Sequence, residues 1–156
     1  MAIEPVRAYF SHYQMDGRIQ EFAESSATVA LAAQALGCKP CRIAKTLSFN
    51  VNGNPILIVV AGDARIDNTK FKSFFQTKAK MLSPEEALEL IGHAVGGVCP
   101  FAVNDGVVTY LDCSLKRFGT VYPACGSSNS AICLTIRELE QHSNFKEWID
   151  VCKDWE

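Results

Sequence analysis

The chain has 156 residues, of which 48% are hydrophobic and 21% are charged, and its formal net charge is −2. This length and composition exclude an intrinsically disordered chain and predict a single domain over residues 1–156. The acidic balance also excludes a strongly basic nucleic-acid binder, so any contact with RNA must use a local patch.

The N-terminal segment predicts neither a signal peptide nor a membrane anchor. Glu4 and Pro5 interrupt the region where a signal peptide would be apolar, and no run approaches the roughly 18 apolar residues of a membrane helix. We therefore expect a cytoplasmic protein without membrane contacts. Residues 5–13 are expected to form a short helix with Pro5 at its first position, followed by a strand over residues 18–23.

An apolar stripe over residues 29–36 predicts the next helix, because its apolar side chains recur at intervals of three and four. Ser26 or Thr28 can cap the start of this helix. Gly37 can end it, since glycine adopts the left-handed conformation that closes a helix.

Two strands joined by a tight turn come next. Residues 43–51 and 55–61 are strand-like, and Asn52-Gly53-Asn54 between them is typical of a β-hairpin. The second strand is apolar at nearly every position, so we expect it to be central and covered on both faces. Asp63 is then expected in a turn and Asp67 at the cap of a helix.

Two capping boxes mark the later helices. Ser83-Pro84-Glu85-Glu86 opens a helix that Gly92 ends, and Thr135-Ile136-Arg137-Glu138 opens another that runs to about His142. Three short strand candidates lie between the two helices, at residues 107–111, 120–125 and 131–134. An amphipathic segment at residues 145–155 follows and should pack on the outside. The strand-rich stretch lacks the helix spacing of repeated βαβ units, which predicts an α+β fold with a mixed sheet.

The seven cysteines do not predict a disulfide framework or a metal centre. Seven is an odd number, and no secretory signal precedes them. Cys38-Lys39-Pro40-Cys41 is the only CxxC motif, and it lacks a second pair or nearby histidines for zinc. It also follows a predicted helix end, whereas a redox motif would open a helix. We interpret the cysteines as small packing residues and expect no metal ion and no cofactor.

Lys45 lies on the face of its strand that should be buried. Side chains alternate between the faces of a strand, and the other odd-numbered positions of 43–51 are all apolar. A lysine there is costly unless it is paired, reaches water or lines a cleft. Two interpretations remain: a packed stem with a solvated ammonium, or an ammonium in an apolar pocket that binds an anion or polarises a carbonyl.

Two loops can complete a pocket around Lys45. Gly96-Gly97-Val98-Cys99-Pro100 allows the backbone to approach a ligand and aim N–H groups at it. Gly126-Ser127-Ser128-Asn129-Ser130 offers hydroxyl and amide groups. Each loop taken alone is also compatible with a plain turn.

Basic residues gather between positions 63 and 80. Five Lys or Arg residues accompany two Asp residues there, a net charge of +3, whereas residues 135–156 carry a net charge of −3. These lysines indicate either a solvated helix face or contacts with a phosphate backbone.

Five motifs occur along the chain: Gly37-x-x-Pro40-x-x-Ile43-Ala44-Lys45-Thr46-Leu47, Gly62-Asp63, Gly96-Gly97-Val98-Cys99-Pro100-Phe101, Val121-Tyr122-Pro123-Ala124-Cys125-Gly126-Ser127 and Leu134-Thr135-x-x-Glu138-Leu139. Together they resemble the YbaK/ProX family, free-standing relatives of the editing domain inserted in bacterial prolyl-tRNA synthetase. The resemblance covers roughly residues 26–139.

The resemblance implies an α+β fold in which helices surround a curved mixed β-sheet that is partly closed like a barrel. It also implies an aminoacyl-tRNA deacylase that hydrolyses the ester of a mischarged small amino acid on tRNA, with an aminoacyl-tRNA synthetase or elongation factor as a candidate partner. Lys45 and Gly97 would be catalytic. Substrate binding would involve Thr46, Gly96, Val98, Cys99, Gly126, Ser127 and Ser128.

One departure from the family concerns the loop after the Gly-Ser pair. Some relatives that remove alanine carry a histidine there, where this chain has Ser128-Asn129-Ser130. Other relatives have been called DNA-binding or regulatory proteins, so a non-catalytic tRNA- or nucleic-acid-binding module is the alternative. Neither the amino acid, the tRNA, the oligomeric state nor the choice of water or a substrate group as nucleophile follows from the sequence.

Overall fold

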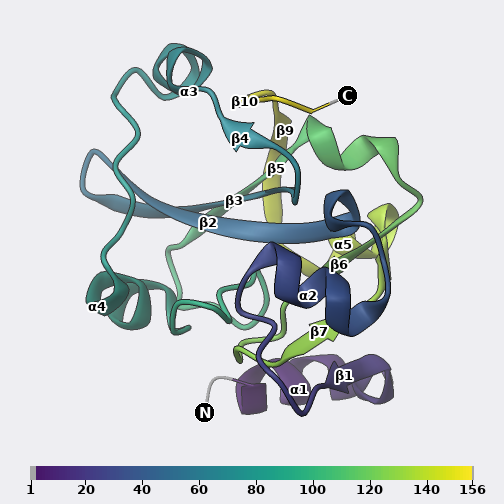
Figure 1. Cartoon of the computed structure of the whole chain (residues 1–156). Coiled ribbons are helices and arrows are strands. Elements are labelled where there is room, and N and C mark those ends of the chain that lie inside the picture. The colour runs from purple at the N-terminus through teal and green to yellow at the C-terminus, as the bar shows by residue number, and fades with distance from the viewer. Residues whose placement is uncertain (1–2, 156) are drawn as a thin grey trace.

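The computed structural model describes residues 3–155. Its main feature is a curled, mixed six-stranded sheet with the strand order β8-β6-β2-β3-β5-β9 (Figure 1). The strands of this sheet are β2 (Ile43–Val51), β3 (Asn54–Ala61), β5 (Val108–Asp112), β6 (Thr120–Pro123), β8 (Leu134–Thr135) and β9 (Phe145–Ile149). The predicted α+β class with a partly barrel-like sheet is confirmed.

Smaller strand pairs and helices surround this sheet. The pairs are β1 (Ile19–Glu21) with β7 (Ser130–Ile132), and β4 (Arg65–Ile66) with β10 (Cys152–Lys153). The helices are α1 (Ile3–Ser11), α2 (Val29–Leu36), α3 (Asn68–Phe75), α4 (Pro84–Glu86) and α5 (Ile136–His142). Shorter helical turns are η1 (Asp16–Arg18), η2 (Pro40–Arg42), the π-helical η3 (Ala87–Ile91) and η4 (Cys113–Arg117).

The β2–β3 hairpin forms the centre of the molecule, as predicted. Its register runs from Ala44 opposite Ala61 to Val51 opposite Asn54. Asn52 and Gly53 have φ values of 54° and 87°, which suit the turn types that match the twist of paired strands. β3 lies between β2 and β5, and its residues 56–61 are all buried, so both of its faces are covered.

The outer edge of β2 is paired only at its two ends. β6 runs parallel to it at Ile43 and Ala44 and then diverges. At the other end, the Asn50 N–H donates to Lys80 O at 2.8 Å, and Ser48 O accepts from the Leu82 N–H at 3.1 Å. Backbone N–H and C=O groups alternate between the two edges of a strand. The peptide groups of Thr46, which lies between these two paired regions, therefore face an opening in the sheet.

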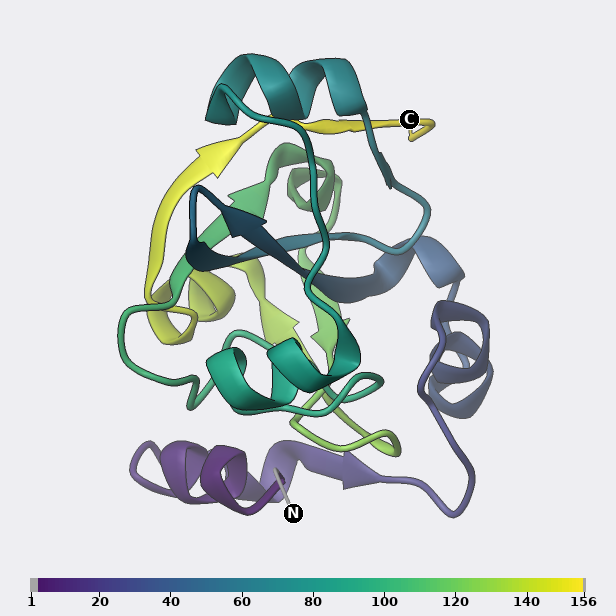
Figure 2. The ribbon, with the colours of Figure 1, turned by 90° about the vertical axis from the view of Figure 1, so that its left-hand side faces the viewer.

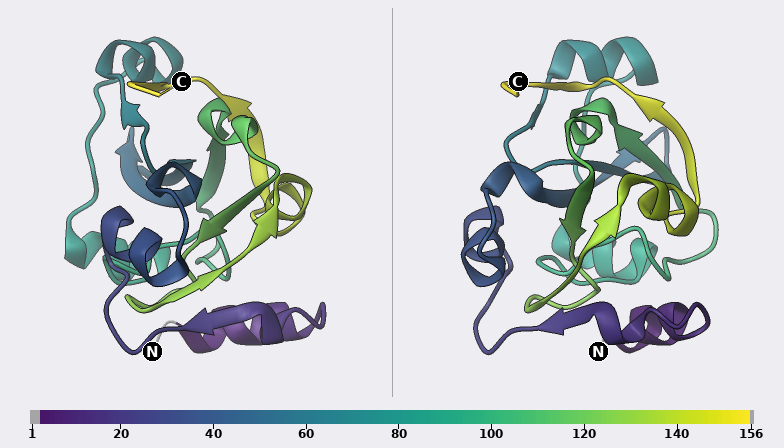
Figure 3. Two further views of the ribbon diagram at one scale, coloured as in Figure 1. Left: turned by 45° about the vertical axis from the view of Figure 1, so that its right-hand side comes forward. Right: turned by 90° about the vertical axis from the view of Figure 1, so that its right-hand side faces the viewer.

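Figures 2 and 3 show what covers this curved sheet. α3 lies at one end of the molecule, beside β4 and β10, while α1 and β1 lie across the opposite end. The segment between α3 and α4 runs past the β2–β3 hairpin and connects these two regions (Figure 2). None of the helices in residues 3–155 combines the length and apolar character that crossing a bilayer requires.

The predicted helix boundaries are largely confirmed. The Thr28 hydroxyl accepts from the Leu31 N–H at the start of α2, and Gly37 ends this helix with φ 70°. Asp67 caps α3, and the Ser83 capping box opens α4, which continues as the π-helical η3 up to Gly92.

Two predicted elements differ from the structure, and a third segment takes a form that was not predicted. α1 already includes Ile3, so Pro5 lies inside the first turn rather than at its first position. The strand predicted over residues 131–134 is split, since β7 pairs with β1 and β8 pairs with β6. The amphipathic segment after residue 145, for which the sequence predicted no element type, forms two strands, β9 beside β5 and β10 beside β4. These pairings join distant segments, so local periodicity does not reveal them.

Glu138 connects α5 to the N-terminal segment. Its carboxylate accepts from the Thr135 N–H in the predicted capping box. The Arg18 guanidinium donates to both carboxylate oxygens, at 2.8 and 3.0 Å, and also to Cys133 O. The hydrogen bonds from Arg18 are the main reason that the Glu138 pKa falls from its ordinary value of 4.5 to about 2.

Replacing Glu138 with Gln is expected to lower the free energy of unfolding by about 1 kcal/mol at neutral pH, since the ion pair is partly exposed to solvent. The folded-state pKa is depressed, so the stabilisation is complete above pH 4.5 and disappears as the pH falls towards 2. Urea unfolding of both proteins across this pH range measures the difference. A difference that stays constant down to pH 2 would contradict the ionic origin of the effect.

Candidate functional site

A cavity of about 280 Å³ lies at the open edge of β2. Both faces of the strand reach it, because β6 leaves this edge after Ala44. α2 and the loops before α2, after η3 and after β6 form its other walls. The lining residues are Ser26, Ala27, Thr28, Val29, Ala32, Ile43, Ala44, Lys45, Thr46, Leu47, Ser48, Met81, Val95, Gly96, Val98, Tyr122, Ala124, Ser130 and Ala131.

Lys45 lines this cavity with a half-buried side chain. Its Nζ donates to Gly62 O at 3.4 Å, a long hydrogen bond that leaves other N–H groups of the ammonium for a ligand. Burial is the main cause that lowers the pKa of Lys45, against smaller opposing effects of Cys152 and Asp63. Of the two interpretations of this lysine, the structure therefore favours an ammonium held beside a cavity.

Thr46 lines the same cavity and carries an unpaired polar group. Its Oγ1 is buried and has no hydrogen-bond partner within residues 3–155, and its peptide faces the unpaired edge of β2. A buried hydroxyl without a partner loses its hydrogen bonds to water on folding. Thr46 Oγ1 is therefore a buried polar atom, on a residue that lines the cavity, whose hydrogen bonds no residue from 3 to 155 satisfies.

The two glycine-containing loops meet at Gly97. A Cβ atom on this residue would lie 2.6 Å from both the carbonyl carbon of Gly126 and the nitrogen of Ser127, so only glycine allows the two backbones to touch. Gly96, with φ 98°, lies beside the side chains of Ala27 and Ser128, whose Cβ atoms would be 3.2 and 3.4 Å from a Cβ atom at this position. The sequence placed these loops near Lys45 only as a hypothesis, and the structure brings them to one cavity.

The predicted site residues take different places around this cavity. Gly96, Val98 and Thr46 line it together with Lys45. Gly97, Gly126 and Ser127 lie behind the lining, where backbone contacts join the loops, and Ser128 is exposed beside Gly96. The Gly97 N–H already donates to Ala94 O at 3.0 Å.

Cys99 is buried away from the cavity. Its sulfur lies 3.5 Å from His93 Nε2 and 3.8 Å from Phe101 O, and His93 Nε2 lies 2.8 Å from the same carbonyl oxygen. Burial raises the pKa of the Cys99 thiol to about 12, so it stays protonated at neutral pH. In this arrangement Cys99 supports the glycine loop from behind.

Two exposed apolar residues at the mouth were not foreseen from the sequence. Met81 and Val95 line the cavity, and 57% and 62% of their surface is exposed. Neither follows a periodic pattern. The only sequence feature that could have pointed to a residue at the mouth of the cavity is an apolar side chain next to a glycine pair, and only Val95 has this position.

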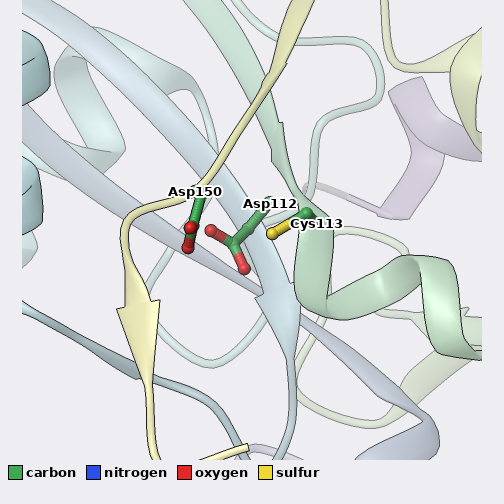
Figure 4. Close-up of side chains that lie close together, drawn as sticks. All are labelled: Asp112, Cys113 and Asp150. Atoms are coloured by element: carbon green, nitrogen blue, oxygen red, sulfur yellow. The ribbon is translucent and has the colours of Figure 1, made fainter. Parts of the chain in front are cut away.

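Asp112, Cys113 and Asp150 form a separate cluster whose ligand-type atoms all lie within 4.8 Å of one another (Figure 4). Both carboxylates already have protein donors. Asp112 accepts from the Ser114 and Val151 N–H groups, at 3.0 and 2.9 Å, and Asp150 accepts from Lys70 Nζ at 3.0 Å. The cluster therefore joins η4 to the C-terminal segment.

Replacing Gly97 with Ala is expected to reduce the free energy of unfolding by about 2–3 kcal/mol, because the new methyl group must push the Gly126–Ser127 backbone away. Gly119→Ala is the matched control, since a Cβ at Gly119 meets no atom within 4 Å and the residue has no positive φ. Denaturant unfolding of both variants measures the difference. Equal stability of the two variants would contradict the close packing of the loops.

Comparison with known proteins identifies a family and relatives of this chain. The family model described as "Aminoacyl-tRNA editing domain" matches residues 23–141. The uncharacterized protein YwhH of Bacillus subtilis is 55% identical over the full length of both chains. The proline–tRNA ligase of Geobacillus thermodenitrificans is 30% identical over 102 residues, which are 65% of this chain and 18% of the ligase.

Solved structures agree with this assignment. A crystal structure described as a proposed trans-editing enzyme for prolyl tRNA synthetase has a TM-score of 0.87 and 27% sequence identity, with 97% of each chain covered. The hypothetical protein APE2540 has a TM-score of 0.79 and 28% identity, with 92% of this chain and 99% of that chain covered.

Proposed function

The chain belongs to the aminoacyl-tRNA editing domain family, and from this premise we propose that it is an aminoacyl-tRNA deacylase. Its reaction is hydrolysis of the ester that joins a mischarged small amino acid to the terminal ribose of tRNA. The observation that carries the proposal is the half-buried Lys45 side chain, whose ammonium has one long hydrogen bond and which lines a cavity together with Gly96 and Val98.

The chemistry requires stabilisation of a negative oxygen. When a nucleophile attacks the ester carbonyl carbon, the carbonyl oxygen gains negative charge in the transition state. The N–H groups of Gly96 and Val98 are the proposed donors to this oxygen, because the Gly97 N–H is occupied. One such donor is typically worth about 3 kcal/mol. Lys45 adds electrostatic stabilisation or holds the hydroxyl or phosphate of the terminal nucleotide.

The proposed nucleophile is water or a group of the substrate itself, so the mechanism needs no protein nucleophile. Cys99 and Cys125 lie behind the glycine loops, and burial raises the pKa of both thiols far above neutral pH. A thiol that stays protonated is a poor nucleophile. The buried cysteines then act through packing.

The size and mouth of the cavity support a small amino acid on an adenosine. About 280 Å³ must hold the aminoacyl group and part of the ribose, which leaves little room for a large side chain. Exclusion by size is worth about 1–3 kcal/mol per methylene group. The exposed side chains of Met81 and Val95 are suited to contact the apolar face of the adenine base.

Replacing Lys45 with Met, which keeps most of the apolar stem, is expected to reduce kcat/KM for deacylation about a hundredfold. The assay incubates the protein with tRNAs charged with Ala, Cys, Ser or Thr, on tRNA-Pro and on their own tRNAs, and measures the loss of acylation. Lys146→Met is the matched control, because this lysine is exposed on β9, remote in the sheet from β2.

Two results of this assay would count against the proposal. Wild-type rates in the Lys45→Met variant would remove the lysine from the mechanism. No hydrolysis of any charged tRNA by the wild-type protein would instead favour a non-catalytic module that binds tRNA.

Replacing Thr46 with Val removes the unpartnered hydroxyl at nearly constant volume. The free energy of unfolding should stay the same or rise, since no internal hydrogen bond is removed. The KM for the best charged tRNA should rise about fivefold if the hydroxyl binds the aminoacyl group, and thermal unfolding with steady-state kinetics measures both quantities. A variant with unchanged KM would exclude Thr46 as a substrate contact.

A further inference from the structure

A groove of about 820 Å³ that is lined mainly by polar residues lies along α3, and its lining residues differ from those of the proposed catalytic cavity. Its walls are one face of α3 and the chain that follows the helix. The lining residues are Asn68, Thr69, Lys72, Ser73, Gln76, Lys78 and Ala79. All but one of these side chains carry a hydrogen-bond donor, and two carry a positive charge.

The two lysines of this groove have no internal counterion. Lys72 and Lys78 are exposed, and neither forms an ion pair with a carboxylate of residues 3–155. Lys70, on the same helix, differs because its ammonium is bound by Asp150 and by the carbonyl oxygen of Cys152. The charges of Lys72 and Lys78 therefore remain available to an external anion.

One continuous segment connects this groove to the mouth of the cavity. The chain leaves α3 at Gln76 and runs to α4 past the open edge of β2 (Figure 2). It is held there by the hydrogen bond from Asn50 to Lys80 and by a β-bridge between Phe49 and Met81. Lys78 lies in the groove and Met81 lies in the cavity wall. They are three positions apart in the chain, so their Cα atoms are at most about 11 Å apart.

We propose that the α3 groove binds backbone phosphates of the single-stranded 3′ end of tRNA, next to the terminal adenosine. This inference rests on the proposed function, which places the terminal adenosine in the cavity. Lysines and the hydroxyl and amide side chains that line the groove are the usual partners of nucleic-acid phosphates. The distance from Lys78 to the cavity is one that a few nucleotides span, so the contact is with the single-stranded end.

Local charge supports this arrangement. The whole chain is acidic, with a net charge of −2, while residues 63–80 carry a net charge of +3. The acidic C-terminal segment lies beside α3 and its Asp150 binds Lys70, so the attraction of a polyanion to this region depends on Lys72 and Lys78. Two phosphate contacts also agree with weak overall binding, which is expected of an acidic protein.

The test compares the wild-type protein with the Lys72→Ala/Lys78→Ala double variant on two substrates. One is charged tRNA, and the other is 3′-O-aminoacyl adenosine, which has the same ester but no phosphate. The ratio of kcat/KM for charged tRNA to that for aminoacyl adenosine should fall about tenfold, through KM. The salt dependence of tRNA binding should also weaken, by about 0.7 in log–log slope for each phosphate that the variant no longer neutralises.

The Lys146→Ala/Lys153→Ala double variant is the control, because it removes the same charge from exposed positions of β9 and β10. An equal fall in the ratio for this control would assign the effect to net charge and overturn the proposal. An unchanged ratio in the Lys72→Ala/Lys78→Ala variant would overturn it as well.

Failure of the proposed function gives a different result. If the wild-type protein hydrolyses neither substrate, binding of uncharged tRNA, measured by fluorescence anisotropy, decides the role of the groove. A loss of affinity confined to the Lys72→Ala/Lys78→Ala variant supports the groove without catalysis. Equal affinity of this variant and the wild-type protein overturns the proposal.

Discussion

The direct contact between the backbone of Gly97 and the peptide that joins Gly126 to Ser127 determines the shape of the cavity. No side chain separates the two loops, so their distance is that of two polypeptide backbones in contact. The His93 and Cys99 side chains fill the space behind the first loop through their contacts with Phe101 O. Because this support is buried, the loop edge at the cavity is positioned by packing rather than by a ligand.

The divergence of β6 from β2 creates the second wall. Had the two strands stayed paired beyond Ala44, the edge of β2 would have been covered and Thr46 would have had backbone partners. Instead Lys45 and Thr46 both line the cavity at this opening, and the buried Thr46 hydroxyl has no partner within residues 3–155. A sheet that is otherwise well paired thus has a local opening where polar groups gather, as is common at functional sites.

Much of the fold could be predicted because its signals are local. The hairpin turn, the capping boxes of Ser83 and Thr135 and the uniform apolarity of β3 depend on neighbouring residues, and all are confirmed. The type of element formed after residue 145 could not be predicted, since β9 exists only through its pairing with β5. Cys99 shows the same limit at the site: its motif position indicated a substrate contact, yet the side chain is buried behind the loop.

From the amino-acid sequence alone it follows that Lys45 falls on the apolar face of its strand and that two glycine-containing loops are available to meet it. Strand periodicity and the conformational freedom of glycine are properties of short segments, so they can be recognised without a fold. The folded arrangement was needed to establish that the loops touch at Gly97, that the Thr46 hydroxyl has no partner within residues 3–155, and that the segment after α3 runs from the α3 groove to the cavity wall. These relations join residues far apart in the chain, and their distances result from packing that no local pattern encodes.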